Sequence, residues 1–361
     1  GARCAVEMAP NPRPSAAPPT PLSDTEQRLL ERVGSCSEHD GIDELEQLEG
    51  CGCLARLATS GWLSGAGLPL AGIDDAEGAR LPSGVAPVID AHVHVFPDPL
   101  FDALWRWFEA HAWPIRYRLR TPALVAFLLE RGVEQLVALT YAHKPGMARA
   151  LNAYVAELAL REPRVIGLGT VLPGEPEAGA IVDEAFAAGL AGLKLHCHVQ
   201  CFAPDDARLA PIFERAASAG RPVVMHAGRE PTSPAYACDP YALCSAERVE
   251  RVLRDFPGLA LVVPHLGADE FEAYARLLER YDNLWLDTTM AVADYFPIET
   301  PWDLVRVRPD RMLFGTDFPN LPYAWDRELG KVLRAGLGDE ALAALLGGNA
   351  AALFGRSTAA S

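Results

Sequence analysis

Histidine placement is the feature of this sequence that most directly suggests chemistry. The chain contains nine histidines, and six of them lie at or just beyond the end of a short apolar run. One buried histidine is usually a hydrogen-bonded core residue, but several that meet a carboxylate are hard to satisfy without a cation. Imidazole and carboxylate groups are the ligands that zinc and similar divalent metals prefer. The six are His92, His94, His196, His198, His226 and His265.

The first two of these histidines have the spacing of a chelating pair. They lie in the sequence VIDAHVH, which has the composition of a buried strand. Side chains alternate between the two faces of a strand, so His92 and His94 project from the same face, about 7 Å apart along it. The spacing therefore predicts that both side chains reach one ion.

Asp317 is the candidate carboxylate, in the sequence GTDFP at the end of the last apolar run. In a closed barrel the last strand lies beside the first, which would bring Asp317 next to His92 and His94. His226 and His265 would add nitrogens from the fifth and sixth strands. The structural alternative for Asp317 is a helix N-cap ahead of the following proline.

Lys194 is a second candidate, because lysine is rare here and this one closes a strand-like run, GLKLH. It could be carbamylated and bridge two metals, pair with a substrate carboxylate, or balance the charge of Asp90 or Asp317. The charge roles rank above the carbamate, because nothing else in the sequence requires a second metal.

The segments that must position these residues are eight short apolar or β-branched runs beyond residue 87. Longer helical segments separate them, such as 208–216, whose apolar residues share one face. Eight strand–helix units in this length predict a (β/α)8 TIM barrel, with an open doubly wound sheet as the alternative topology. The runs are 88–96, 135–141, 165–172, 190–196, 222–226, 259–265, 284–288 and 312–317.

The first 87 residues differ from the rest in composition. Residues 10–22 hold six prolines among small polar residues, which predicts an extended tether. Ser23 and Glu26 fit a capping box at the start of a short helix, and a second short acidic helix is expected around 42–48. We therefore expect an N-terminal, partly helical accessory region at 1–87 and the barrel at 88–361.

Composition limits the expected partners. Acidic residues outnumber basic ones 48 to 32, which gives a formal net charge of −16. Such a surface repels nucleic-acid phosphates and anionic lipids, so a small-molecule substrate is expected rather than nucleic acid or membrane. No long apolar run or secretory signal pattern is seen, which predicts a cytoplasmic protein, and the acidic N-terminal region suggests a homo-oligomer. Eight cysteines in 361 residues are too few for a disulfide scaffold and predict free thiols.

Taken in order, the strand-end motifs resemble those of the amidohydrolase superfamily. They are most similar to its amidohydrolase-related branch, which includes the aminocarboxymuconate semialdehyde decarboxylase-like enzymes. The resemblance covers roughly residues 88–355 and rests on HVH at 92–94, KLH at 194–196, His226, His265 and GTDFP at 315–319.

The sequence departs from the branch's pattern at two positions. Cys197 stands where a proline often follows the KLH, and Asn320 stands where a histidine often follows the DFP. Both departures concern substrate contacts more than metal binding.

The resemblance implies a metal centre with catalytic groups beside it. Zinc is the expected metal and manganese the alternative, while a second ion on a carbamylated Lys194 ranks lower. Asp317, His265 and Lys194 are the expected catalytic residues, with the carboxylate accepting a proton from water and the imidazole polarising or protonating the substrate. One divalent ion is expected on His92, His94, His226 and Asp317.

Two activities and one non-catalytic role are the expected functions of this centre. The first is hydrolysis of a C–N or C–O acyl bond in an amide, lactone or ester by a metal-activated water. The alternative is non-oxidative decarboxylation on the same site, as in the decarboxylase members that the motifs resemble. A further alternative is a non-catalytic metal-binding barrel that acts as a binding partner.

Basic residues in the loops after the strands suggest an anionic, carboxylated substrate. Arginine pairs bidentately with carboxylates, although these arginines could equally neutralise nearby acids. The long segment that follows the fifth strand and contains Tyr236 is a candidate lid. The loop residues are Arg116, Arg118, Arg120, His143, Lys144 and Arg229, and the predicted substrate-binding residues are Arg229, His196, His198, Tyr141 and His143.

Overall fold

Residues 7–8, 63–64, 72–295 and 300–355 are described by the structure, a computed structural model of the chain. The chain divides into two compact units, Gly1–Ala76 with Ala293–Thr300, and Glu77–Val292 with Pro301–Ser361. In the first unit, β1 (Glu7–Met8) pairs antiparallel with β2 (Leu63–Ser64). The predicted tether, capping box and acidic helix lie outside the described residues, and the predicted boundary at residue 87 stays a prediction.

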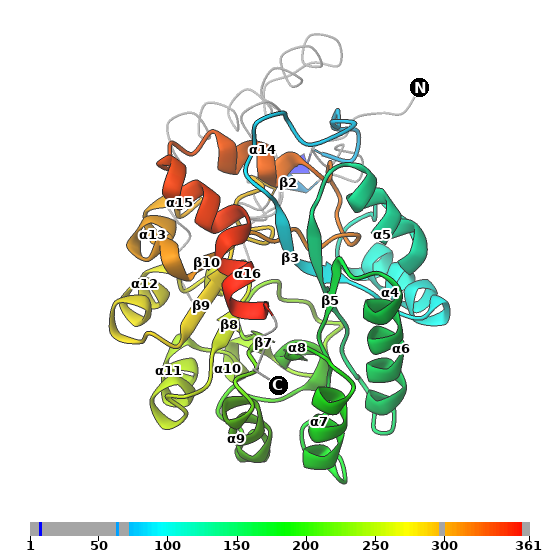
Figure 1. The fold of residues 1–361 in the computed structure, drawn as a ribbon, viewed down its shortest axis with the longest axis vertical. Coiled ribbons are helices and arrows are strands. Elements are labelled where there is room, and N and C mark those ends of the chain that lie inside the picture. Colours follow the sequence, from blue (N-terminus) through cyan, green and yellow to red (C-terminus); the bar gives the residue numbers. More distant parts are fainter. Residues whose placement is uncertain (1–6, 9–62, 65–71, 296–299, 356–361) are drawn as a thin grey trace. The chain divides into compact units, whose positions relative to one another are not determined.

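Eight parallel strands form the centre of the second unit (Figure 1). Each strand lies within one of the eight predicted runs. The strands are β3 (Ile89–His94), β4 (Gln135–Leu139), β5 (Val165–Gly167), β6 (Leu193–His196), β7 (Val223–His226), β8 (Leu261–Val263), β9 (Leu284–Asp287) and β10 (Met312–Leu313).

Backbone hydrogen bonds close these strands into a barrel. β3, β4 and β5 form one sheet, and β6 to β10 form the other. At one junction Lys194 N donates to Gly169 O at 2.7 Å, and at the other His94 N donates to Phe318 O at 2.8 Å. The predicted (β/α)8 barrel is therefore confirmed, and the chain does not form the alternative open sheet.

Helices follow the strands and surround them (Figure 1). The helix predicted in 208–216 is confirmed as α9 (Ala210–Ser218), which buries Ile212, Phe213 and Ala216. The short helices α8 (Cys197–Gln200) and α10 (Pro240–Leu243) lie in the segments after β6 and β7. The remaining helices are α4 (Asp98–His111), α5 (Thr121–Glu130), α6 (Ala148–Arg161), α7 (Ala178–Ala187), α9 (Ala210–Ser218), α11 (Ala246–Asp255), α12 (Phe271–Arg280), α13 (Trp302–Val307), α14 (Arg327–Leu333), α15 (Asp339–Ala343) and α16 (Asn349–Phe354).

Strand alternation decides which side chains face the barrel interior. In β6, Leu193 and Leu195 belong to the hydrophobic core that the strands share with the helices. Lys194 and His196 alternate with them and so point to the opposite face, toward the interior. The same alternation holds in β7 and β9, so polar side chains from several strands collect inside the barrel at its C-terminal end.

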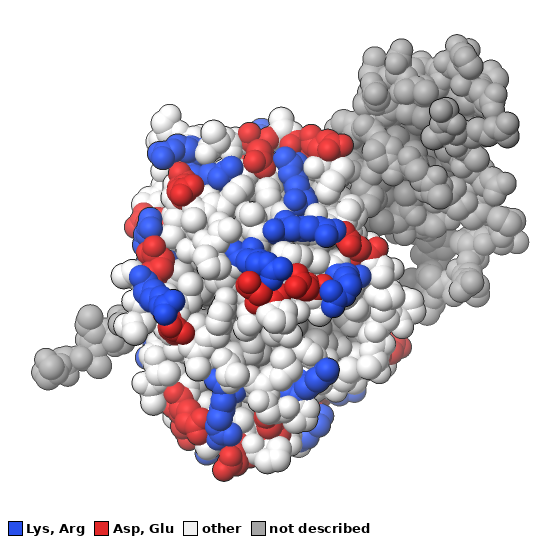
Figure 2. Space-filling view, turned by 90° about the vertical axis from the view of Figure 1, so that its right-hand side faces the viewer, with Lys and Arg blue, Asp and Glu red and all other residues white. Residues whose placement is uncertain are grey.

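The surface of the barrel unit mixes charges of both signs. Figure 2 shows one face on which basic and acidic side chains lie side by side. Many arginines form ion pairs with neighbouring acids, such as Arg149 with Glu184 at 2.7 Å. Over the ranges that the structure describes, no helix combines the length and the apolar character needed to span a bilayer.

Asp90 fastens the first strand of the barrel to the segment after the last. Its carboxylate accepts hydrogen bonds from Thr316 Oγ1 at 2.6 Å, from Thr316 N at 3.1 Å and from His92 N at 3.1 Å. Burial raises the pKa of Asp90 to about 7, although these hydrogen bonds act in the opposite direction. Asp90 therefore holds the turn that carries Asp317 against the strand that carries His92.

Replacing Thr316 with valine tests this connection. The Thr316→Val side chain keeps its shape but removes the hydroxyl that donates to the buried Asp90 carboxylate and accepts from Phe318 N. Leaving these buried groups without their partner costs at least about 1–3 kcal/mol. We expect the free energy of unfolding, measured by urea denaturation, to fall by that amount. The matched variant Thr232→Val, at an exposed position, should leave it unchanged. Equal stability of the two variants would show that the bond contributes nothing.

Candidate active site

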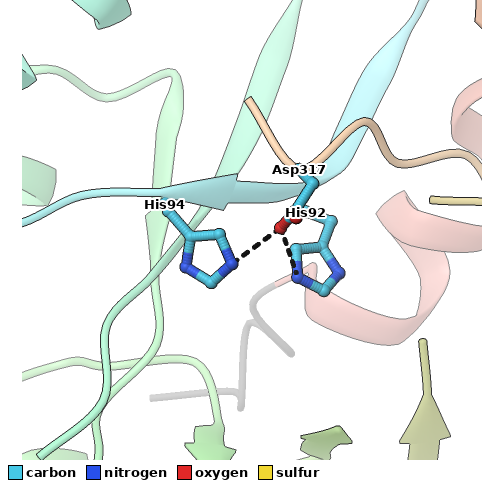
Figure 3. Close-up of side chains that lie close together, drawn as sticks. All are labelled: His92, His94 and Asp317. Atoms are coloured by element: carbon cyan, nitrogen blue, oxygen red, sulfur yellow. Dashed lines mark ion pairs between the residues drawn. The ribbon is translucent and has the colours of Figure 1, made fainter. Parts of the chain in front are cut away.

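Two histidines of β3 and the aspartate that follows β10 converge at the mouth of the barrel (Figure 3). Asp317 Oδ1 lies 2.8 Å from His94 Nε2 and 3.4 Å from His92 Nε2. The two imidazole rings are 5.1 Å apart between centroids. One ligand atom from each residue lies within 4.8 Å of the others. The predicted meeting of the first and last strands around Asp317 is thus confirmed.

Local backbone geometry places Asp317 at this point. Its φ of 74° is in the left-handed region, and its N–H donates to His92 O at 2.9 Å. Two residues earlier, a Cβ on Gly315 would lie 2.4 Å from Thr289 Oγ1 and 2.8 Å from His92 Cβ. Because neither contact is tolerable, only glycine lets the chain pass so close to His92.

Asp287, at the end of β9, orients two of the histidines and is not among the predicted site residues. Its Oδ2 lies 2.8 Å from His92 Nδ1, and its Oδ1 accepts from the backbone N of His265 at 3.0 Å. A carboxylate on the far nitrogen of a histidine fixes the tautomer and directs the other nitrogen toward a metal. The signal in the sequence is an acidic residue that ends a buried strand, LWLD.

The charge states at the centre are those that metal ligands require. Burial, with the nearby Lys194, lowers the pKa of His92 to about 3. Burial opposes ionisation of Asp287, but His92 and His265 outweigh it and the pKa is about 2. Burial also opposes ionisation of Asp317. His94 and His92 nevertheless hold the pKa of Asp317 below its usual range. Both carboxylates are therefore ionised beside the histidines that contact them.

His226 and His265 form a hydrogen-bonded chain between two carbonyl groups. His265 Nδ1 lies 2.9 Å from Thr289 O, His265 Nε2 lies 3.1 Å from His226 Nδ1, and His226 Nε2 lies 3.2 Å from Glu230 O. Two neutral imidazoles have only two N–H groups for these three contacts. Burial lowers the pKa of both histidines, which disfavours a third proton. One contact therefore lacks a proton, as expected where a cation binds.

These observations fit a divalent metal. The ligand set of two nitrogens and one oxygen comes from His92, His94 and Asp317. Asp287 hydrogen-bonds to the Nδ1 of His92, the nitrogen that faces away from the site. The buried Nδ1 of His94 has no hydrogen-bond partner. His92, His94 and Asp317 thus form a site for a divalent metal. His226 packs against the rings of His196, His198 and His265. Its role as a ligand stays a prediction.

Lys194 lies inside the barrel next to the centre. The side chain is fully buried, and its Nζ donates to His92 Nε2 at 3.3 Å. Burial lowers the pKa of Lys194 to about 8, against the attraction of Asp287 and Asp317. The lysine therefore faces the centre itself and makes its hydrogen bond to an imidazole.

The predicted substrate-binding residues divide into two groups. Tyr141 and His196 line the mouth with their rings 5.1 Å apart, and His198 donates from Nε2 to Gly228 O at 2.7 Å. His143 is exposed in the loop after β4. Arg229 lies 3.3 Å from Glu270, so it neutralises an acid. The loop arginines Arg116, Arg118 and Arg120 are likewise paired with acidic residues.

Aromatic rings line the mouth beside the histidines. The ring of Tyr141 lies 5.2 Å from that of Phe96 and 5.7 Å from that of His94. Tyr236 from the loop after β7 packs on His198 and on Trp107 of α4, each at 5.2 Å between ring centroids. Flat apolar surfaces therefore adjoin the His–His–Asp site.

A closed eight-stranded parallel barrel with histidines and aspartates at the C-terminal ends of its strands defines a class, the metal-dependent TIM-barrel enzymes. Comparison with known families then gives a specific match. The family described as amidohydrolase matches residues 89–356, and the chain belongs to this family. The resemblance seen in the strand-end motifs is thereby confirmed.

Solved structures show the same fold at low sequence identity. An uncharacterised TIM-barrel protein from Bordetella bronchiseptica is 24% identical, with a TM-score of 0.58 over 75% of this chain and 100% of its own. The 5-carboxyvanillate decarboxylase from Sphingomonas paucimobilis is 19% identical, with a TM-score of 0.56 over 74% of this chain and 99% of its own.

A dihydroxybenzoic acid decarboxylase from Polaromonas, with bound manganese and the inhibitor 2-nitroresorcinol, is 17% identical. Its TM-score is 0.57 over 75% of this chain and 97% of its own. These likenesses establish the barrel fold. No curated protein matches the chain.

Metal analysis of the purified protein tests the centre. We expect about one equivalent of a divalent metal, because the His–His–Asp set holds one ion. The His94→Ala variant should retain only a small fraction of it after dialysis, whereas His111→Ala, at an exposed position on α4, should retain all of it. Inductively coupled plasma mass spectrometry measures the metal content of each variant. A metal content that is the same in the two variants would contradict the site.

The role of Asp287 is tested by Asp287→Asn. Both oxygens of Asp287 accept hydrogen bonds, from His92 and from the backbone of His265, and an amide of the same shape has only one acceptor oxygen. We expect metal affinity, measured by competition with a chelator, to fall roughly 10- to 100-fold. The control is Asp303→Asn, which removes an exposed carboxylate. Unchanged affinity in Asp287→Asn would show that His92 needs no such support.

Proposed function

We propose that this protein is a metal-dependent, non-oxidative decarboxylase of a small aromatic carboxylate. The observation that carries the proposal is the position of the His92–His94–Asp317 site beside the rings of Tyr141 and Phe96. In this proposal a flat apolar ring would lie against these side chains, with its carboxylate toward the centre. Solved structures of similar fold that are named as decarboxylases of 5-carboxyvanillate and of dihydroxybenzoic acid support the same assignment.

Zinc or manganese would be held by His92, His94 and Asp317, with His226 as the proposed fourth ligand. When bound, the ion supplies fixed positive charge that stabilises negative charge developing on the substrate. The ligand residues themselves are buried, which excludes water and strengthens every electrostatic interaction at the centre.

The reaction breaks the bond between the ring carbon and the carboxylate. Carbon dioxide leaves, the electron pair stays on the ring carbon, and a proton takes the place of the carboxylate. We assign the proton transfer to His265, which would take up a proton from solvent and pass it to the ring carbon. The His265 ring lies 5.6 Å from that of His92 and 4.6 Å from that of His226. Thr289 O fixes the orientation of His265. Lys194 would attract the substrate carboxylate through its positive charge.

Hydrolysis of an amide, lactone or ester is the second candidate. It is favoured by the small number of protein ligands in the His92–His94–Asp317 set, because sites that activate water leave a coordination position open. In that reaction Asp317 would accept a proton from water, and His265 would act on the leaving group. The two candidates share the same residues and differ in the bond that breaks.

Product analysis in heavy water distinguishes the two reactions. The metal-loaded protein is incubated in D2O with a panel of hydroxybenzoates and of aryl esters, lactones and amides. Decarboxylation predicts carbon dioxide release and one deuterium on the former carboxyl-bearing carbon, seen by NMR. The Asp317→Asn variant should lose at least roughly 100-fold in rate, on the order expected for a group at the reacting centre. Cleavage of an acyl bond without carbon dioxide would overturn the decarboxylase and support the hydrolase.

A further inference from the structure

Four cysteines gather beside the mouth of the barrel. Cys197 and Cys201 lie at the start and just past the end of α8, and Cys238 and Cys244 lie in the long segment between β7 and α11. All four are free thiols. Among the described residues, three converging ligand atoms occur only at His92, His94 and Asp317, so the thiols do not form a comparable metal cluster.

The four thiols form two pairs. Cys201 Sγ and Cys238 Sγ both point to the same acceptor, His198 O, at 3.6 Å and 3.3 Å. The shared carbonyl therefore brings together one sulfur from the end of α8 and one from the segment after β7. Cys197 and Cys244 make up the second pair of cysteines.

The two pairs differ in their access to solvent. Cys197 and Cys244 are both fully buried, whereas Cys201 and Cys238 are each partly exposed. Oxidation of a thiol requires contact with the oxidant, so exposure selects the pair of Cys201 and Cys238. Cys201 and Cys238 thus combine proximity to each other with access from solution.

We propose that Cys201 and Cys238 are a modification site, an accessible dithiol that hydrogen peroxide converts into a disulfide. The Cys201 thiolate attacks one peroxide oxygen, which forms a sulfenic acid and releases hydroxide that becomes water. The Cys238 sulfur then displaces the sulfenic oxygen, which leaves as a second water. Two thiols lose two electrons and two protons, and one peroxide is reduced to two waters.

The disulfide would restrain the loop after β7. Tyr236 precedes Cys238 by two residues and packs on His198 of α8, and Cys201 follows α8 directly. A covalent bond between Cys201 and Cys238 therefore fixes this loop to α8 at the point where Tyr236 contacts His198. This inference does not depend on which reaction the centre performs.

Peptide mapping of the full chain tests the proposal. The reduced protein is treated with hydrogen peroxide, blocked with N-ethylmaleimide, digested and analysed by mass spectrometry. We expect a linked peptide that contains Cys201 and Cys238 and disappears on treatment with dithiothreitol. Cys201→Ser and Cys238→Ser should each abolish it, and the matched variant Cys244→Ala should keep it.

Two results would overturn the proposal. The first is recovery of Cys201 and Cys238 as separate maleimide adducts after peroxide treatment. The second is linkage of either one to a different cysteine, including the four in the first 53 residues. The restraint is tested by hydrogen exchange of the 229–245 amides, which should slow several-fold on oxidation in the wild type and not in Cys238→Ser. Unchanged exchange despite a formed disulfide would refute the restraint.

Discussion

Closure of the barrel is the constraint on which the active site depends. His92 and Asp317 are more than two hundred residues apart in the chain, and they meet only because the last strand lies beside the first. Asp90 secures this junction with hydrogen bonds to Thr316 on one side and to the backbone of His92 on the other. The site is therefore a property of the whole barrel, and anything that loosens the junction moves a carboxylate away from its imidazoles.

Much of this arrangement could be predicted from the sequence. Strand ends are marked by short apolar runs, and the spacing of His92 and His94 fixes their shared face. Once the runs are counted as eight, the position of Asp317 follows from topology. Asp287 could not be predicted in the same way, because an acidic residue at a strand end has many roles and only its contact with His92 Nδ1 selects one.

The loops are the least predictable part of the site. Whether Arg229 meets a substrate or an acid depends on how two separate loops fold, and the structure places it beside Glu270. The bond between His226 and His265 likewise depends on ring orientations that no spacing encodes. The pairing of the cysteines has the same origin, since the thiols belong to segments whose relative position is set by tertiary packing.

The missing side chain at Gly315 bears on how this enzyme can be altered. A Cβ there would collide with Thr289 and with His92, so the position is closed to every substitution by ordinary amino acids. A mutant library intended to change selectivity would therefore lose all members that vary residue 315. Diversity placed at Tyr141 and Tyr236, whose rings border the mouth from separate loops, avoids that loss and leaves the ligand geometry in place.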